Sequence, residues 1–321
     1  MADTDIGGKA VQWFPGHMAK TRRRIREDLP LVDAVVELRD ARLPLSSTNP
    51  ELTDLIAGKK RIIILNKADL ADEKTTRDWL SFYEKQGAAA LAADSRSGKG
   101  LNALKKVVTT VLADTIRKNA ERGMAGKPLR LMVVGIPNTG KSSFINRLSS
   151  SAKAKVEDRA GVTRHNKWYV IGGGLELLDT PGVLWPKFED PEVGYRLAFT
   201  GGVKDQILDI EELAVKLLEI LSRDYPDRLT ERYKVPAPGE LPPYELLQAI
   251  GKKRGMLISG GEVDTLRAAT MLFDELRAGK LGRLSFERPP EMKDLTKPAQ
   301  KPDPSASERP PETQTQTETE A

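Results

Sequence analysis

Gly135-Ile136-Pro137-Asn138-Thr139-Gly140-Lys141-Ser142 is the strongest indication of the fold in this sequence. It follows an apolar run, Leu129 to Val134, and it precedes a helical pattern around Phe144 to Leu148. This is the G-x-x-x-x-G-K-[ST] pattern of a phosphate-binding loop, in which backbone N–H groups converge on phosphate oxygens. The lysine of such a loop supplies positive charge to the β- and γ-phosphates, and the hydroxyl group after it binds Mg²⁺. The stretch therefore predicts a nucleotide site between a strand and a helix.

The sequence on both sides of this loop alternates short β-type runs with helical patterns. Strands separated by helices indicate crossover connections and a mainly parallel sheet, so we predict an α/β fold. One helix is expected from Leu101 to Arg117, where apolar side chains recur at helical spacing. The expected strands are Ala34 to Leu38, Arg61 to Leu65, Ala88 to Ala92, Leu129 to Val134, Lys167 to Ile171 and Leu175 to Leu178.

A change of pattern after about Lys204 predicts a second, small all-helical domain. The β-type runs stop there, and three amphipathic stretches follow, at Ile207 to Leu221, Tyr244 to Ile250 and Val263 to Leu276. Prolines at 236, 238, 242 and 243 separate the first two stretches. In the last stretch we expect Leu266, Met271, Phe273 and Leu276 to be buried. The predicted organisation is a flexible N-terminus (1–10), an α/β domain (11–203), a helical domain (204–288) and a disordered tail (289–321).

The composition of the 321 residues, with 39% hydrophobic and 30% charged residues, is typical of a soluble globular chain. No apolar run approaches the roughly 20 residues that span a membrane, and the N-terminus lacks the apolar stretch of a secretory signal. We therefore expect a cytoplasmic protein without a membrane partner. The absence of cysteine excludes disulfides and thiolate chemistry. The tail holds four basic and seven acidic residues, so the rest of the chain carries a formal charge of +8, which favours a polyanionic partner.

Asn66-Lys67-Ala68-Asp69 follows an apolar run and would lie at the carboxyl end of a strand, where parallel sheets bind their ligands. A carboxylate there can accept two hydrogen bonds from the N1–H and N2–H₂ groups of guanine, whereas adenine would leave Asp69 unpaired. Asn66 can hold the loop and meet the base, while the stem of Lys67 covers the face of the base. Ser95-Arg96-Ser97-Gly98 is a weaker motif, which could bring backbone N–H groups towards the guanine O6 atom.

Asp179-Thr180-Pro181-Gly182 matches the second element that contacts metal and γ-phosphate. We expect Asp179 to hold Mg²⁺ through water, the N–H group of Gly182 to meet the γ-phosphate, and Thr163 to close over Mg²⁺. The predicted GTP-binding residues are Asn66, Lys67, Asp69, Ser95, Arg96, Asn138, Thr139, Gly140, Lys141, Ser142, Ser143, Thr163 and Gly182. The predicted Mg²⁺ ligands are Ser142, Thr163 and Asp179.

The order of these motifs is a circular permutation, because the base-reading motifs precede the phosphate-binding motifs. The neighbours in a sheet, rather than the chain connections, define the site, so a permuted chain can build the same pocket. The segment after Gly182 leads into the predicted helical domain. Loss of the γ-phosphate could therefore be transmitted to that domain.

Together with Trp13-Phe-Pro-Gly-His17-Met and Asp40-Ala-Arg42-Leu-Pro44, the motif order resembles the YlqF (RbgA) family of circularly permuted bacterial GTPases over about residues 11 to 288. The resemblance implies GTP hydrolysis in late assembly of the large ribosomal subunit and a C-terminal domain that contacts ribosomal RNA. Ribosomal proteins are further candidate partners, and we expect a monomer. A small-subunit assembly GTPase and a GTP-binding protein with negligible turnover are the alternatives.

Many GTPases place a water-orienting glutamine directly after the glycine of the D-x-x-G motif, but here that position is Val183. Intrinsic hydrolysis should therefore be slow until the ribosomal particle stimulates it. The resemblance implies a catalytic role for His17, beside Lys141 and Thr163, and His165 is the alternative histidine. Asn138 resembles an asparagine that lets some GTPases bind K⁺, although it could equally stabilise its own loop.

Basic residues in the predicted helical domain are the candidates for RNA contact, because phosphate groups need mobile cations on an exposed edge. The alternative for each of them is a solvated charge on the surface. The candidate RNA-binding residues are Lys252, Lys253, Arg254, Lys280 and Arg283.

Overall fold

The computed structural model describes residues 3–6, 9–12, 15–151, 156–157, 167–185, 188, 190–203 and 209–290. By its contacts the chain divides into Met1–Arg288 and Pro289–Ala321. The predicted boundary between residues 203 and 204 falls at the start of a stretch outside the described residues. The predicted disordered tail also lies outside them, apart from Pro289 and Pro290.

A seven-stranded sheet with the order β5-β4-β3-β6-β9-β8-β7 forms the centre of the first unit. Five neighbouring strands are parallel, and β8 and β7 add antiparallel at one edge, so the predicted mainly parallel sheet is confirmed. The strands are β3 (Ala34–Asp40), β4 (Lys60–Asn66), β5 (Ala89–Ala92), β6 (Leu129–Val134), β7 (Val156–Glu157), β8 (Trp168–Ile171) and β9 (Leu175–Asp179).

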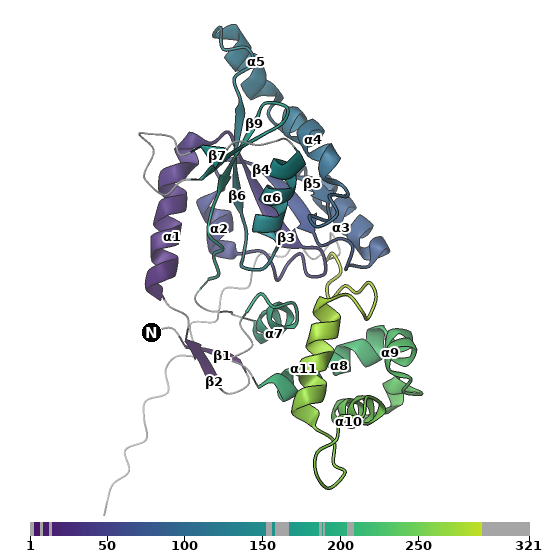
Figure 1. The fold of residues 1–321 in the computed structure, drawn as a ribbon. Helices are drawn as coiled ribbons and strands as arrows, with labels where there is room; N and C mark the ends of the chain where they lie inside the picture. Colours follow the sequence, from purple (N-terminus) through teal and green to yellow (C-terminus); the bar gives the residue numbers. More distant parts are fainter. Residues whose placement is uncertain are drawn as a thin grey trace, which may run out of the picture. The chain divides into compact units, whose positions relative to one another are not determined.

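Helices cover both faces of this sheet (Figure 1). Because alternate side chains of a strand point to opposite faces, Val36 and Leu38 pack with α4 and α6, whereas Val35 packs with α1 and α2. On that second face α3 packs against β4 through Trp79. The helices are α1 (Pro15–Asp28), α2 (Pro50–Leu55), α3 (Glu73–Lys85), α4 (Leu104–Val111), α5 (Ala113–Glu121) and α6 (Lys141–Ser151).

The single helix predicted from Leu101 to Arg117 is wrong. The structure has a 3₁₀ turn at Leu101–Ala103, then α4, and a break at Leu112 before α5. Leu112 is buried against the sheet, but α5 buries none of its residues. The packing that orders the helix along the sheet therefore ends at Leu112.

In the described part of the chain five α-helices follow the sheet: α7 (Pro191–Phe199), α8 (Ile210–Asp224), α9 (Pro226–Tyr233), α10 (Pro243–Lys253) and α11 (Thr265–Arg277). They share one hydrophobic core, which includes Phe199 of α7 and Phe273 and Leu276 of α11. The expected burial of Leu266 is wrong, since its side chain is 55% exposed at the start of α11. Met271 is partly buried. No helix of the described residues is both long enough and apolar enough to cross a membrane.

Part of the stretch predicted as a flexible N-terminus (residues 1–10) forms strands, while its flexibility stays a prediction. Strands β1 (Asp3–Ile6) and β2 (Lys9–Gln12) pair as an antiparallel hairpin. Each strand has only four residues, which is too few for an alternation of apolar and polar side chains to indicate the pairing.

Candidate functional site

A cavity of about 610 Å³ lies at the carboxyl ends of the central strands, where parallel sheets bind their ligands. It brings the phosphate-binding loop together with Lys67 from the end of β4 and with the Asp179 motif from the end of β9. Asp69, Ser95 and Arg96 do not line it. The lining residues are Arg24, Lys67, Asn138, Gly140, Lys141, Ser142, Ser143, Lys167, Asp179, Thr180, Pro181 and Gly182.

Lys141, at the start of α6, is buried and lines this cavity. Its Nζ atom donates hydrogen bonds to the carbonyl oxygens of Gly135 (3.0 Å) and Ile136 (2.7 Å). Burial lowers the pKa of the Lys141 ammonium group to about 8, although the negative charge of Asp179 opposes this shift. Two carbonyl oxygens compensate only part of the lost hydration, so the ammonium group is suited to meet a phosphate.

Two glycines allow the loops around the cavity to approach each other closely. Gly140 has a φ of +91°, and a Cβ atom there would lie 2.4 Å from Nδ2 of Asn66. At Gly182 a Cβ atom would lie 2.9 Å from the backbone nitrogen of Pro137 and 3.0 Å from Nζ of Lys141. Any larger residue at Gly182 would therefore push the D-T-P-G segment away from the phosphate-binding loop.

Ser142 and Asp179 present a hydroxyl and a carboxylate oxygen to the same cavity, which are ligand types that Mg²⁺ prefers. Within the described part of the chain no cluster of three or more His, Cys, Asp or Glu residues could hold a metal. This donor set fits Mg²⁺, which keeps several waters and needs few protein ligands, and the ion would neutralise phosphate charge. The third predicted ligand, Thr163, lies outside the described residues, as does His165.

The positive charges around the cavity were only partly found from the sequence. Burial raises the pKa of Asp179, and the charges of Lys141, Lys167 and Arg24 oppose that shift. Arg24 belongs to a basic run in α1, far from any recognised motif, and Lys167 directly precedes β8. The sequence does not indicate which basic residues reach the cavity. Arg24 and Lys167 were therefore not predicted as residues of the nucleotide site.

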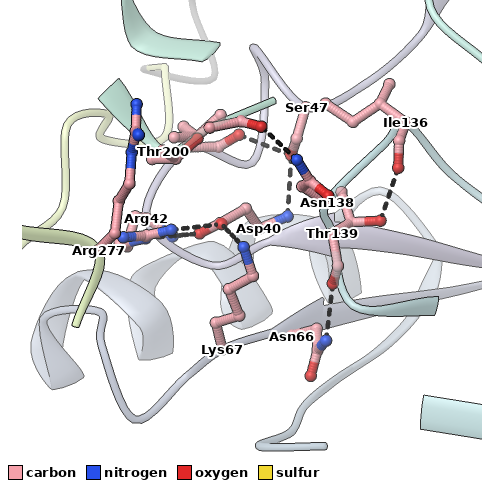
Figure 2. Close-up of polar contacts among 12 residues, drawn as sticks. Asp40, Arg42, Ser47, Asn66, Lys67, Ile136, Asn138, Thr139, Thr200 and Arg277 are labelled. Atoms are coloured by element: carbon pink, nitrogen blue, oxygen red, sulfur yellow. Dashed lines mark hydrogen bonds and ion pairs between the residues drawn. The ribbon is translucent and has the colours of Figure 1, made fainter. Parts of the chain in front are cut away.

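Asn66 ties three loops together at the carboxyl edge of the sheet. Its Nδ2 atom donates to the carbonyl oxygen of Thr139 at 2.7 Å (Figure 2). Its Oδ1 atom accepts from the backbone N–H (3.1 Å) and the hydroxyl group (2.7 Å) of Ser95. The loop after β4 (residues 66–72), which is predicted to read the base and which we call the base-reading loop, is thus joined to the phosphate-binding loop and to the loop after β5 through one buried amide. A contact of Asn66 with the base stays a prediction.

Lys67 has a φ of +59°, an uncommon conformation for a residue with a side chain. Its Nζ atom lies 3.0 Å from Oδ2 of Asp40 (Figure 2). The Oδ1 atom of Asp40 accepts from Nε of Arg42, and its Oδ2 atom accepts from Nη2 of Arg42. Asp40 is fully buried, yet these two cations hold the pKa of its carboxyl group well below the usual range. The D-A-R motif therefore holds the end of the Lys67 side chain.

The other predicted nucleotide residues lie on the surrounding loops. Arg96 is exposed, and its backbone N–H donates to the side chain of Asp94. Asn138 has a φ of +60°, and its exposed side-chain amide donates to the carbonyl oxygen of Gly201. Val183 is buried in a hydrophobic core that also contains Ile25 of α1, so its side chain does not reach the cavity.

His17 lies in the first turn of α1, seven residues before Arg24. The backbone of this turn is described, whereas Trp13 and Phe14 lie outside the described residues.

The candidate RNA-binding residues fall into two groups. Lys252 and Lys253, in the last turn of α10, and Lys280 are exposed. Arg254 is exposed too but stacks over the ring of Tyr233 at 5.3 Å, and Arg283 donates to a carbonyl oxygen of the base-reading loop. The last two therefore have partners within the protein.

The permuted motifs and their common cavity define a P-loop GTPase, an enzyme that binds GTP and, as its class generally does, Mg²⁺. A family model described as "50S ribosome-binding GTPase" matches residues 130–234. That match begins in β6, so Asn66 and Ser95 precede it, as the permutation requires.

Curated relatives cover nearly the whole chain. "Ribosome biogenesis GTPase A" of Bacillus cereus is 45% identical over 283 residues, 88% of this chain and 95% of that protein. The protein of the same name from Priestia megaterium is 47% identical over 285 residues, 88% of this chain and 98% of the relative. The chain belongs to the ribosome biogenesis GTPase A family.

Solved structures agree with this assignment. GDP-bound TM YlqF is 32% identical with a TM-score of 0.57, and the match covers 83% of this chain and 99% of that one. GNP-bound YlqF from T. maritima is 30% identical with a TM-score of 0.58, over 84% of this chain and 98% of the other. The predicted fold class and the predicted GTPase activity are therefore confirmed.

Proposed function

We propose that this GTPase acts in late assembly of the large ribosomal subunit and that its helical domain contacts ribosomal RNA. The names of the relatives and the "50S ribosome-binding GTPase" description support this role. The exposed Lys252 and Lys253 and the basic charge outside the tail suit a polyanionic partner. Ribosomal proteins are further partners, and the protein acts as a monomer in the cytoplasm.

One contact carries the argument for a molecular switch. The side-chain amide of Asn138, in the phosphate-binding loop, donates to the carbonyl oxygen of Gly201, which lies between α7 and α8. A change at the phosphates can therefore act directly on the connection between the GTPase domain (11–203) and the helical domain (204–288). In this scheme the GTP-bound form engages the precursor particle, and hydrolysis releases it.

The proposed chemistry assigns one task to each polar group. Lys141 neutralises the β- and γ-phosphates, while Ser142, Asp179 and Thr163 hold Mg²⁺. Asp69 reads guanine, supported by Asn66, Lys67, Ser95 and Arg96. Because Val183 cannot orient water, we assign that task to His17 once the partner has ordered the N-terminal segment.

The side-chain oxygen of Asn138 is the proposed protein ligand for a K⁺ ion. Its amide nitrogen contacts Gly201, so the oxygen of the same exposed side chain is available for a monovalent cation near the phosphates. Such an ion would supply the positive charge that other GTPases obtain from an arginine.

The decisive experiment measures GTP hydrolysis by the pure protein alone, with large subunits and with small subunits, at one salt concentration. We expect a slow basal rate and stimulation by large subunits only. Stimulation by small subunits alone would assign the protein to assembly of the small ribosomal subunit. A rate that neither subunit changes would refute the proposed role while leaving the GTPase assignment intact.

A further inference from the structure

The segment after α11 returns to the loop that carries Asp69. We call residues Leu281–Glu287 the C-terminal strap. Arg283 donates from Nε to the carbonyl oxygen of Asp69 at 3.1 Å and from Nη2 to that of Ala68 at 3.5 Å. The backbone N–H of Leu284 donates to the carbonyl oxygen of Leu70 at 2.9 Å. Two neighbouring strap residues thus hold three consecutive carbonyl groups of the base-reading loop.

The strap also fixes the far end of this loop, where α3 begins. The backbone N–H of Asp72 donates to Oγ of Ser285 at 3.1 Å. The carboxylate of Asp72 caps α3 by accepting from the N–H of Thr75 at 2.7 Å. Nη1 of Arg283 lies 3.2 Å from a carboxylate oxygen of Glu73. The loop is therefore held by Asn66 at its start and by the strap from Ala68 onward.

A second set of contacts joins the strap to the D-A-R loop beneath Lys67. The N–H of Phe286 donates to the carbonyl oxygen of Arg42 at 2.8 Å. The buried carboxylate of Glu287 accepts from the N–H groups of Leu45 (2.7 Å) and Ser46 (3.0 Å). Because Asp40 of the same loop pairs with Lys67, the strap supports both residues that flank the proposed base position.

We propose that the C-terminal strap determines guanine affinity, with Arg283 as the positioning residue that sets the backbone of Asp69. A hydrogen-bonding carboxylate discriminates between bases only when its position is held within a fraction of an ångström. This inference rests on the proposed role of Asp69 as the residue that reads guanine. It reassigns Arg283, predicted from the sequence to contact RNA, to the nucleotide site.

The strap continues directly from α11, so it couples the helical elements to the base. Coupling between two binding sites is reciprocal. If a partner binds the helical elements more tightly when the strap is released, it must lower the affinity for guanine nucleotides by the same factor. Engagement of that partner therefore speeds GDP release without a separate exchange factor.

The test uses the full chain with Arg283→Ala and Arg283→Lys, with Arg223→Ala as the matched control. Arg223 is an exposed arginine of α8 that donates hydrogen bonds to its neighbour Asp224. We expect Arg283→Ala to weaken GDP binding about tenfold and to raise its dissociation rate by a similar factor. Arg283→Lys should fall between, since lysine keeps the charge but loses the planar fork.

A ligand without a base separates positioning from general damage. The affinity for inorganic pyrophosphate should stay within twofold in Arg283→Ala, because the hydrogen bonds of this side chain go to Ala68, Asp69 and Glu73 rather than to the phosphate-binding loop. Ser285→Ala, which removes only the acceptor for Asp72, should weaken GDP binding by about threefold. Unchanged GDP affinity in Arg283→Ala, or an equal loss of pyrophosphate affinity, would overturn the proposal.

Asp69→Asn distinguishes a failure of this proposal from a failure of the proposed role of Asp69 in reading guanine. If Asp69 reads guanine, Asp69→Asn weakens GDP binding, and adding Arg283→Ala causes little further loss because both changes act on one interaction. If Asp69→Asn keeps full GDP affinity, the proposed role of Asp69 in reading guanine is refuted. A loss in Asp69→Asn together with fully additive loss in the double variant would refute the strap alone.

Discussion

The Nδ2 atom of Asn66 donates a hydrogen bond to the backbone carbonyl of Thr139 across 2.7 Å, joining the base-reading motif to the phosphate-binding loop. The two residues lie 73 positions apart, and the base-reading motif comes first. Strands β4 and β6 flank β3, so both loops emerge at one edge of the sheet in spite of the permutation. The fold therefore brings together the base-reading and phosphate-binding motifs, which lie far apart in the permuted chain.

The first prediction concerns the hydrogen bonds of this amide. Asn66→Ala removes three of them at a buried position and leaves the carbonyl of Thr139 and the groups of Ser95 without that partner. We expect a loss of about 1–3 kcal/mol in the free energy of unfolding, because unsatisfied buried groups keep their desolvation cost. GDP affinity should fall by at least about tenfold as the loops separate. Denaturant titration and calorimetric titration with GDP measure the two effects, and normal values for both would contradict it.

The second prediction is a pH dependence of nucleotide affinity. Burial disfavours the ammonium form of Lys141 and lowers its pKa to about 8. Bound phosphate favours that form and raises the pKa, so nucleotide binding takes up protons around and above pH 8. Affinity for GDP should therefore fall as the pH rises from about 7 to about 9.

Calorimetric titration in two buffers of different ionisation enthalpy measures this proton uptake. Lys141→Met should bind weakly and without uptake by this group. If the wild-type protein binds GDP with the same affinity and without proton exchange across this range, the low pKa of Lys141 is excluded.

The strands and nucleotide motifs could be predicted because their signals are local. The Leu129–Val134 run and the loop after it are contiguous, and neither depends on knowing what packs against it. The break at Leu112 and the exposure of Leu266 depend on where the packing against other elements ends. A periodic pattern of apolar residues does not carry that information.

The charged residues show the same limit more sharply. Arg24 and Arg283 both look like surface cations in the sequence, yet one lines the nucleotide cavity and the other holds the loop of Asp69. Both positions result from contacts between segments far apart in the chain. Charge alone indicates a polyanionic partner and does not say which cations already have one.

The third prediction concerns Arg24. The buried Ile25 and Val183 share one core, which anchors α1 beside the cavity, and Arg24 lines that cavity. A cation there can stabilise negative charge that develops on the γ-phosphate, so Arg24→Ala should lower kcat by at least about tenfold. Arg24→Lys should retain part of the rate. Arg23→Ala is the control for single-turnover hydrolysis, because the Arg23 side chain on the same helix is 81% exposed. A normal kcat in Arg24→Ala would exclude this role.

The fourth prediction tests the proposed role of His17. His17→Ala should bind GTP with normal affinity but lose at least about tenfold of the rate stimulated by large subunits, since general-base and positioning groups act on the attacking water. His17→Gln should recover part of that rate, because an amide can still hydrogen-bond to water. Stimulated hydrolysis by His17→Ala at the wild-type rate would assign the water to another group.

The fifth prediction concerns the monovalent cation. If the side-chain oxygen of Asn138 binds K⁺, hydrolysis should be faster in KCl than in NaCl at equal ionic strength. Asn138→Asp keeps an oxygen at this position, whereas Asn138→Ala removes both the ligand and the hydrogen bond to Gly201. We therefore expect K⁺ stimulation to persist in Asn138→Asp and to vanish in Asn138→Ala. Equal rates of the wild-type protein in the two salts would leave Asn138 with only the contact to Gly201, and the charge on the γ-phosphate would then fall to Lys141, Arg24 and Mg²⁺.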